Sequence, residues 1–157
     1  MTISTTNIKN SYVGNGSTSA FTYTFKITDD DDIQVIIRSA SGTETVKTKT
    51  THYTVAGVNN AGGGTITFTA GNIPTSTQTV ILRRSTPQTQ ELDLIANSDL
   101  PSDSLENSYD KLTLIAQELQ EQIDRSIKLS RTNEMTSTEF TVGATDRANK
   151  ILAFDSS

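Results

Sequence analysis

Residues 20–27 read Ala-Phe-Thr-Tyr-Thr-Phe-Lys-Ile, and their apolar and polar side chains alternate. One face of this stretch carries the large apolar residues Phe21, Tyr23, Phe25 and Ile27. Alternation with a period of two is typical of an antiparallel strand that is buried on one side. The stretch therefore predicts a sheet with one apolar face.

Further short segments of the same kind follow at near-regular intervals, with glycine, asparagine and aspartate between them. We expect strands at residues 32–39, 43–50, 53–55, 65–69 and 79–83. Short strands separated by turn residues are typical of a small sandwich or barrel. The fold class predicted here is mainly β, a small antiparallel β-sandwich or barrel-like domain, followed by a long α-helix.

The composition indicates a thin core. The chain has 157 residues, of which 33% are hydrophobic and 27 are threonines. Leu, Ile, Val and Phe make up about 23%, just above the ~20% below which chains tend to stay disordered. Threonine is β-branched and suits strand positions that face water. We expect one folded domain with an appendage.

Several classes of protein are excluded by residue type. Without cysteine there is no disulfide framework, no Cys-ligated zinc and no thiol nucleophile, and the single histidine excludes most His-based metal sites. A net charge of −5 argues against a nucleic-acid partner, which would need a basic patch. No apolar run approaches the ~20 residues of a membrane span, so no membrane partner is expected.

A long helix is expected after the strands. Residues 104–129 contain neither glycine nor proline, so the helix would span roughly 37 Å at ~1.5 Å per residue. Its apolar residues recur at alternating steps of four and three, the heptad spacing of helices that associate. We name them the seam and predict that they are the oligomerisation residues: Leu105, Tyr109, Leu112, Ala116, Leu119 and Ile123.

The seam has two interpretations. It could be the buried face of an ordinary amphipathic helix lying on the sheet. However, a small sheet cannot cover about 25 helical residues, so part of the seam needs another partner, and self-association is the simplest one. The heptad spacing alone does not fix the number of chains in such an assembly.

The chain is therefore predicted to have three parts. Residues 1–100 form the antiparallel β domain with a connector, and residues 101–130 form the amphipathic oligomerisation helix. Residues 131–157 are polar and threonine-rich, with two short apolar pieces. Such pieces cannot build a core alone, so we interpret this part as a linker that leads into a region beyond Ser157.

Four local motifs contain residue types that can serve in chemistry, and none predicts a catalytic, cofactor or metal site. The acidic run Asp29–Asp32 lacks the spacing of a calcium loop and is better explained as a solvated turn. Gly62–Gly64 lacks the order of a phosphate-binding loop, and His52 has no partner of a catalytic triad nearby in the sequence. Arg83–Arg84 could bind an acidic surface, although a solvated pair, or pairing with local carboxylates, is the simpler expectation. We expect no enzyme activity.

The ordered set of motifs resembles the N-terminal tail-attachment domain of T7-like podophage tail fibre and tailspike proteins. The family pattern Gly-x-x-x-x-Phe-x-x-Phe is similar to the segment that begins at Gly14, and Asp-Tyr-x-Val is similar to residues 52–55. The resemblance extends over about residues 12–155. The similar segments are residues 14–21, 23–25, 32–35, 42, 52–55, 63–68, 80–84, 90, 105–112, 117–119, 125–129 and 146–155.

Three positions depart from the family pattern. His52 stands where the family has Asp before the Tyr, and Asn107 and Ser108 are more polar than the usual alanine-type helix residues. None of them belongs to the seam. The departures therefore concern surface contacts rather than the assignment.

The resemblance implies attachment as the function. In that family this domain anchors a trimeric fibre to the phage tail, where adaptor and nozzle proteins meet, while a distal region recognises or degrades the host surface. It implies a homotrimer with a trimeric helical bundle, tail adaptor and nozzle proteins as partners, and a place in the virion tail after assembly in the bacterial cytoplasm. The lack of cysteine fits that reducing compartment.

Two other functions stay open at this point. The chain could be a glycan-binding β-sandwich module of an adhesin, which would need an exposed aromatic platform. It could also be a fragment of a tailspike depolymerase. Paired carboxylates on a concave face would be required for glycoside hydrolysis, and one sequence cannot place them.

Overall fold

The structure is a computed structural model that describes residues 3, 5–89, 92, 102–128 and 131–132. Seven strands precede one helix in the described part of the chain. The elements are β1 (Lys9–Val13), β2 (Ala20–Tyr23), β3 (Ile33–Arg38), β4 (Glu44–Val46), β5 (Tyr53–Ala56), β6 (Gly64–Phe68), β7 (Thr79–Arg84) and α1 (Ser102–Asp124).

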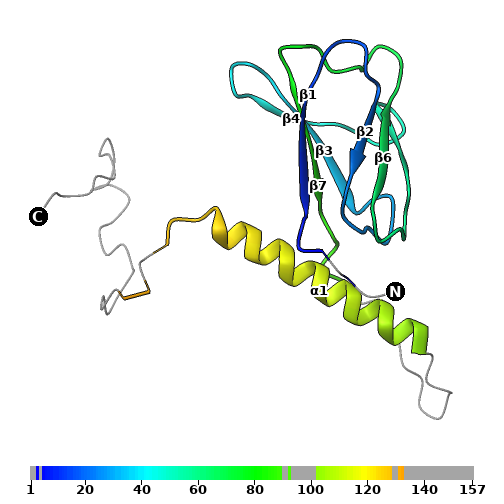
Figure 1. Ribbon diagram of the computed structural model, residues 1–157, viewed down its shortest axis with the longest axis vertical. Helices are drawn as coiled ribbons and strands as arrows, with labels where there is room; N and C mark the ends of the chain where they lie inside the picture. The colour runs from blue at the N-terminus through cyan, green and yellow to red at the C-terminus, as the bar shows by residue number, and fades with distance from the viewer. Residues whose placement is uncertain (1–2, 4, 90–91, 93–101, 129–130, 133–157) are drawn as a thin grey trace, which may run out of the picture. The chain divides into compact units, whose positions relative to one another are not determined.

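The strands form two antiparallel sheets that face each other (Figure 1). One sheet has the order β1-β7-β3-β4 and the other has the order β2-β6-β5. The first residue of β1, Lys9, pairs with Arg83 near the end of β7, and Ile33 at the start of β3 pairs with Arg84. The starts of β1 and β3 and the end of β7 therefore lie at one end of the sandwich.

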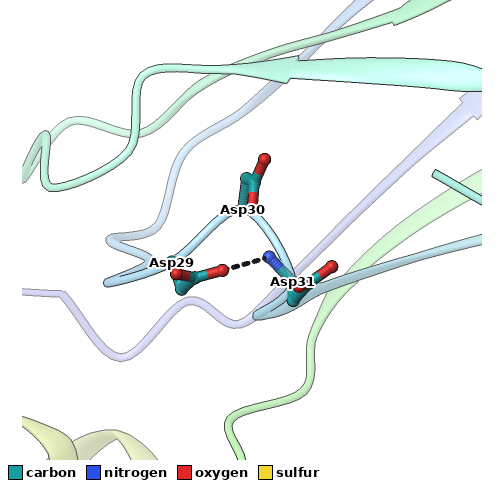
Figure 2. Close-up of side chains that lie close together, drawn as sticks. All are labelled: Asp29, Asp30 and Asp31. Carbon is teal, nitrogen blue, oxygen red and sulfur yellow. Dashed lines mark hydrogen bonds between the residues drawn. The ribbon is translucent and has the colours of Figure 1, made fainter. Parts of the chain in front are cut away.

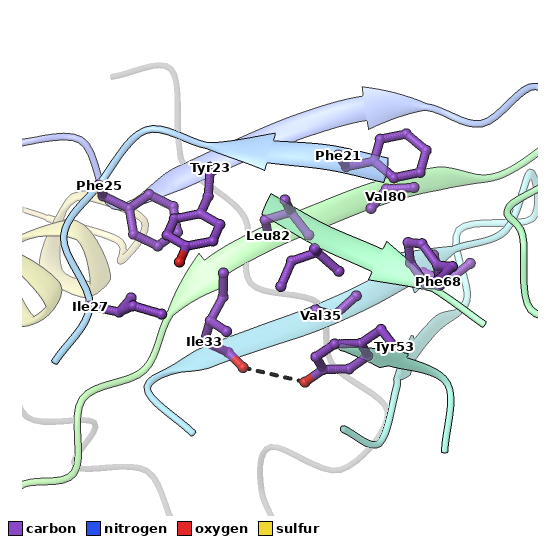
Figure 3. Close-up of a cluster of buried hydrophobic side chains, with 12 residues drawn as sticks. Phe21, Tyr23, Phe25, Ile27, Ile33, Val35, Tyr53, Phe68, Val80 and Leu82 are labelled. Atoms are coloured by element: carbon purple, nitrogen blue, oxygen red, sulfur yellow. Dashed lines mark hydrogen bonds between the residues drawn. The ribbon is translucent and has the colours of Figure 1, made fainter. Parts of the chain in front are cut away.

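The core lies between the two sheets and confirms the predicted mainly β class (Figure 3). The alternating residues of the 20–27 stretch are all at most 5% exposed. Phe21 packs edge-on against Phe68 of β6, with ring centroids 5.7 Å apart. The Tyr23 hydroxyl donates a hydrogen bond to the Ala56 carbonyl at 2.8 Å, and burial raises the pKa of this phenol. Aromatic side chains of this size supply much of the apolar area that a thin core needs.

Strand β2 is shorter than the alternation predicts. It ends at Tyr23, yet Phe25 and Ile27 beyond it are 0% exposed. The alternation therefore predicted correctly which side chains are buried, but only part of the stretch is paired as a strand. Strand β4 is also shorter than expected, with three exposed residues.

Strand β1 was not predicted. Its sequence Lys-Asn-Ser-Tyr-Val shows no large apolar residue at alternate positions, and none of its side chains is fully buried. It is held by its pairing with β7 and by hydrogen bonds to β2 and to Thr24 just after β2. Tyr12 donates to the Thr22 carbonyl at 2.6 Å, and the Asn10 side chain accepts from the Thr24 amide at 3.0 Å.

The turn between β5 and β6 depends on a glycine. Gly63 has a φ of +87°, and a Cβ at this position would lie 1.9 Å from the Tyr23 carbonyl oxygen. That oxygen belongs to the backbone and cannot rotate away. Glycine allows both the left-handed conformation and the close approach of the two chain segments.

Helix α1 begins at Ser102 and ends at Asp124, whereas the expected helix continued to about residue 129. The Ser126 amide bonds to the Ile123 carbonyl at 3.0 Å, and the Ser126 hydroxyl bonds to the same oxygen at 2.6 Å. A serine that satisfies a local carbonyl in this way competes with continuation of the helix. This local bonding accounts for the earlier end.

The chain divides into two compact units, Met1–Ser126 and Ile127–Ser157. The first unit contains both the sandwich and α1. The predicted linker at residues 131–157 lies almost entirely outside the described residues. Residues 93–100 of the predicted connector also lie outside them. The three-part division at residues 100 and 130 stays a prediction.

Candidate functional site

Helix α1 contacts the sandwich through a polar face. Its buried residues are Asp110, Leu114 and Glu118, which recur every four positions and so share one side of the helix. Two of the three carry a carboxylate. We name this side the docked face. Its contacts lie at the end of the sandwich where β7 ends and β1 and β3 begin.

A buried ion pair holds the centre of the docked face. Arg84, the last residue of β7, is 0% exposed, and its Nε donates to Glu118 Oε1 at 2.9 Å. Thr86 donates to the same carboxylate through its amide at 3.0 Å and its hydroxyl at 2.7 Å. The second guanidinium nitrogen donates to the Gln117 side chain at 2.8 Å. We name Arg84, Thr86, Gln117 and Glu118 the Arg84 cluster.

The electrostatics of this cluster are those of a desolvated charge with compensating partners. Burial lowers the pKa of the Arg84 guanidinium, while the hydrogen bond and the charge of Glu118 act in the opposite direction. A buried cation is tolerated only when it is paired and hydrogen-bonded. Glu118 supplies the charge, Gln117 accepts a further hydrogen bond from the guanidinium, and Thr86 holds the Glu118 carboxylate. Nη1 of Arg84 is buried and has no hydrogen-bond partner among the described residues.

A second buried ion pair lies four residues before Leu114 on the helix. Lys26, in the segment after β2, donates to Asp110 Oδ2 at 2.7 Å, and both side chains are less than a tenth exposed. Leu114 is 0% exposed between the two ion pairs. Gln117 also donates to the Thr5 carbonyl at 3.0 Å, which joins the helix to the segment before β1.

A third, more exposed group of charges extends the docked face toward the end of the helix. Glu121 accepts two hydrogen bonds from Arg125, at 2.6 and 2.9 Å, and this pairing lowers the pKa of the Glu121 carboxyl. Lys9 and Arg83 lie 3.9 and 3.8 Å from the same carboxylate. The docked face is therefore fixed mainly by charged and polar contacts, with Leu114 as its buried apolar residue.

The seam lies away from the docked face. Tyr109 is 67% exposed, Leu112 63%, Leu119 44% and Ile123 52%. Ala116 is exposed as well, and Leu105 is partly buried. The helix thus has the reverse of the usual arrangement, because its charged residues face its own domain while its apolar residues face outward.

This arrangement argues against one interpretation of the amphipathic pattern, in which the seam lies on the sheet. In an ordinary amphipathic helix lying on a sheet, the seam would be the buried face. In the structure the buried positions are Asp110, Leu114 and Glu118, so the sandwich does not cover the seam. The role of the six seam residues in oligomerisation stays a prediction.

The acidic run forms a turn that is neutralised by a lysine. Asp29, Asp30 and Asp31 bring three carboxylate oxygens within 4.8 Å of one another (Figure 2). Lys49 Nζ lies 2.6 Å from Asp30 and 2.5 Å from Asp31. The hydrogen bond from Lys49 lowers the pKa of Asp30, and the same contacts raise the pKa of Lys49. The lysine thus balances one of the three negative charges of the turn.

The fourth carboxylate of the run has a different role. Asp32 is 3% exposed, and its Oδ2 accepts hydrogen bonds from the amides of Thr28 and Asp29 and from the Thr28 hydroxyl. These bonds close the turn that leads into β3. The interpretation of the run as a strand-opening turn agrees with this geometry.

The remaining motifs also have local structural contacts. His52 Nδ1 lies 3.0 Å from the Thr48 amide, which donates to it within a turn. Gly62–Gly64 form the turn before β6 and the first residue of that strand. Arg83 and Arg84 both approach carboxylates of α1. The expectation of a solvated pair or of local carboxylates is wrong for Arg84, which is 0% exposed and pairs with Glu118, 34 residues away.

The docked face was missed at the level of sequence. Arg84 and Glu118 are 34 residues apart, and Lys26 and Asp110 are 84 residues apart. One signal was present, because Arg84 is in phase with the inward-facing Val80 and Leu82 of the same strand. An arginine on the apolar face of a strand indicates a buried partner.

Within the described residues, no helix has both the length and the apolar character needed to cross a membrane.

The chain is similar to a known phage protein. The chain is 32% identical over 133 residues to the tail spike protein of Salmonella phage epsilon15. The aligned region covers 82% of this chain and 12% of the length of that protein, so the chain corresponds to a small part of the relative. No family model matches the chain. This similarity supports the assignment of the chain as part of a phage tail protein.

Proposed function

We propose that this chain is the N-terminal anchor of a trimeric phage tail fibre or tailspike. In this proposal the seams of three copies form a helical bundle, and the anchor binds tail adaptor and nozzle proteins in the virion. Its role is structural and not enzymatic. Host adsorption is performed by a distal region outside the chain, and assembly takes place in the bacterial cytoplasm.

One observation supports self-association. The seam faces outward on a helix whose opposite face is fixed to its own domain. Because the Arg84 cluster and the Lys26–Asp110 pair hold α1, rotation of the helix to bury the seam against the sandwich would break two buried ion pairs. Breaking a buried pair costs about 3–5 kcal/mol. Copies of the same helix bury the seam without that cost.

The gain from burial is substantial. Full removal of a leucine or isoleucine side chain from water stabilises by about 1.5–3 kcal/mol. Leu112, Leu119 and Ile123 are each roughly half exposed or more in the single chain. Each copy in a bundle would therefore gain several kcal/mol, which offsets the loss of translational freedom on association.

The anchoring part of the proposal is supported by the similarity to a tailspike protein and by the ordered motifs of the tail-attachment family. The chain matches only 12% of the relative, which suits an anchor that carries a much larger distal region. The described aromatic residues of the sandwich that are buried, Phe21, Tyr23, Phe25, Tyr53 and Phe68, are unavailable as a glycan platform.

The seam is tested with Leu112→Asp combined with Leu119→Asp. Sedimentation of the wild-type chain is expected to give the mass of three copies, and the double variant the mass of one. A matched control is Asn107→Asp with Gln122→Asp, which adds the same charge at exposed positions off the seam and is expected to keep the wild-type mass. If the double variant also keeps the wild-type mass, the seam assignment is wrong.

The anchoring role is tested separately by co-purification of the chain with tail adaptor and nozzle proteins. We expect the wild-type chain to retain an adaptor or nozzle protein. If the assembled chain binds none of them, the anchoring proposal fails even though self-association stands.

A further inference from the structure

The two arginines at the end of β7 have different surroundings. Arg84 points toward the core, where it bonds to Glu118 and Gln117. Arg83 lies on the outer face of the sheet, because it alternates with the buried Leu82 and Arg84. Its Nε has no hydrogen-bond partner among the described residues, and its Nη2 lies 3.8 Å from Glu121, too far for a hydrogen bond. Arg83 therefore remains a candidate for the acidic surface that the sequence left open as a partner.

Arg83 belongs to a group of three cations around one carboxylate. We name Lys9, Arg83 and Arg125 the basic patch. Arg125 donates to both oxygens of Glu121, at 2.6 and 2.9 Å, whereas Lys9 Nζ and Arg83 Nη2 stay at 3.9 and 3.8 Å from the same carboxylate. One negative charge thus faces three positive charges. The patch has a local excess of two positive charges on a chain whose net charge is −5.

Strand pairing brings two of these cations together in an unfavourable way. Lys9 of β1 is the direct cross-strand partner of Arg83 of β7, and the neutral Gln34 of β3 is the partner on the other side. Like charges directly opposite each other destabilise a pair of strands. Positions where a sequence breaks such a local rule are expected to be functional or strained. The pairing therefore indicates a role for the two charges other than stabilising the sheet.

The basic patch is open to solvent. The side chains of Lys9, Arg83 and Arg125 are 47%, 24% and 54% exposed. The hydrogen bond and the charge of Glu121 raise the pKa of Arg125, and the charge of Glu44 adds to this effect. Arg125 is thus the best compensated of the three cations. Lys9 and Arg83 carry the excess charge and can meet an anion from outside.

We propose that the basic patch binds carboxylates of an acidic segment on a partner protein, and that this partner is the tail protein to which the chain is anchored. The guanidinium of an arginine suits a carboxylate, because it can donate two parallel hydrogen bonds, and lysine adds a point charge beside it. This inference rests on the anchoring function proposed above. It adds to that function the surface and the chemistry of the contact.

The carboxylate at the centre of the patch favours a protein over a nucleic acid as the partner. Nucleic acids are bound by cations that follow the phosphate backbone along a stripe or a groove. Here Glu121 lies among the cations and would repel a continuous row of phosphates. A pair of carboxylates instead matches the excess of two positive charges, and such complementarity sets specificity and the rate of association.

Lys9→Glu tests the proposal in the full chain by reversing one charge of the patch. We expect its association rate with the adaptor or nozzle protein that the wild-type chain retains to fall at least about tenfold at low salt, with a smaller difference at high salt. The new carboxylate lies opposite Arg83, where opposite charges favour strand pairing, so circular dichroism should show an intact fold. Lys9→Gln, which only removes the charge, is expected to give an intermediate rate.

The matched control is Lys47→Glu, which makes the same change in charge just after β4, outside the basic patch. It is expected to keep the wild-type association rate. If Lys9→Glu and Lys47→Glu both bind as fast as the wild-type chain, the inference is wrong and the anchoring function stands. If both slow binding equally, only the net charge matters and the inference is also wrong.

A hexaglutamate peptide provides a second probe that does not require a tail protein. We expect it to shift the amide NMR signals of Lys9, Arg83 and Arg125 in the wild-type chain, and a hexaglutamine peptide to leave them in place. If the acidic peptide shifts them while no tail protein binds, the anchoring function fails and the acidic docking site stands. If it shifts none of them, or if a single-stranded oligonucleotide shifts them more, the inference is overturned.

Discussion

Arg84 and Glu118 form a buried ion pair whose partners can be removed one at a time. Arg84 is 0% exposed and Glu118 is 7% exposed. A desolvated pair contributes little net stability compared with apolar residues of the same size, but loss of one partner leaves an uncompensated charge. The pair is therefore expected to fix the position of the helix more than to add stability.

The first prediction concerns Glu118→Gln. This change keeps the shape of the side chain and removes its charge, so Arg84 stays buried without an anion. We expect the free energy of unfolding, measured in urea, to fall by about 3 kcal/mol, at the lower end for a broken buried pair. The Arg84→Met plus Glu118→Met double variant is expected to recover most of this loss.

Glu121→Gln is the matched control. Glu121 is also an acid of α1 paired with an arginine, but the Arg125 side chain is 54% exposed. Solvent screens such a pair, and we expect a change below about 1 kcal/mol. Equal losses of unfolding free energy for Glu118→Gln and Glu121→Gln would contradict the prediction, because burial of the Arg84 cluster would then not increase the cost of removing a charge.

At the scale of elements, Gly63 in the turn between β5 and β6 can be compared with Gly71 in the turn after β6. Gly63 and Gly71 both have positive φ, +87° and +85°. A Cβ at Gly71 would meet nothing within 4 Å, whereas at Gly63 it would meet the Tyr23 carbonyl. The difference between the two sites isolates the steric contact from the backbone conformation.

We expect Gly71→Ala to cost about 1–2 kcal/mol, the penalty of the left-handed conformation alone. Gly63→Ala is expected to cost at least about 2 kcal/mol more, because the added Cβ would clash with backbone atoms that must move. Urea unfolding of both variants gives the two values. If they agree, the β5–β6 turn relaxes freely and does not position β2 against β6.

The elements that could be predicted are those whose buried residues recur at regular intervals along the sequence. The 20–27 stretch predicted the core residues of β2 because alternate side chains share a face. Strand β1 could not be predicted in this way, because Lys9–Val13 is held by pairing with β7 and by polar contacts. The end of α1 depends on a hydrogen bond of Ser126, which a heptad pattern does not include.

The two faces of the helix differ in the same way, since one could be predicted from the sequence and the other could not. The seam was found because its residues repeat along one element. The docked face was missed because its partners come from segments 34 and 84 residues away. Composition alone treats Glu118 and Asp110 as solvent-facing charges, and only the tertiary arrangement shows that they face the sandwich.

At the scale of the whole molecule, a thin core and an exposed seam imply that stability depends on concentration. Any process that buries surface only in the assembled native state stabilises it by mass action. The wild-type chain should therefore unfold at higher temperature when it is more concentrated. The sandwich and helix should respond together, because the Arg84 cluster joins them.

The last prediction gives this dependence a magnitude. A tenfold rise in concentration adds about 1.4 kcal/mol for each association step, and for a chain of this size 1 kcal/mol shifts the unfolding midpoint by about 2–4 °C. We expect a rise of several degrees per tenfold concentration, followed by far-ultraviolet circular dichroism. The Leu112→Asp plus Leu119→Asp variant should unfold at one temperature at all concentrations. A wild-type midpoint that is equally independent of concentration would mean that the seam stays in water, and the sandwich with its docked helix would then be stable as a single chain.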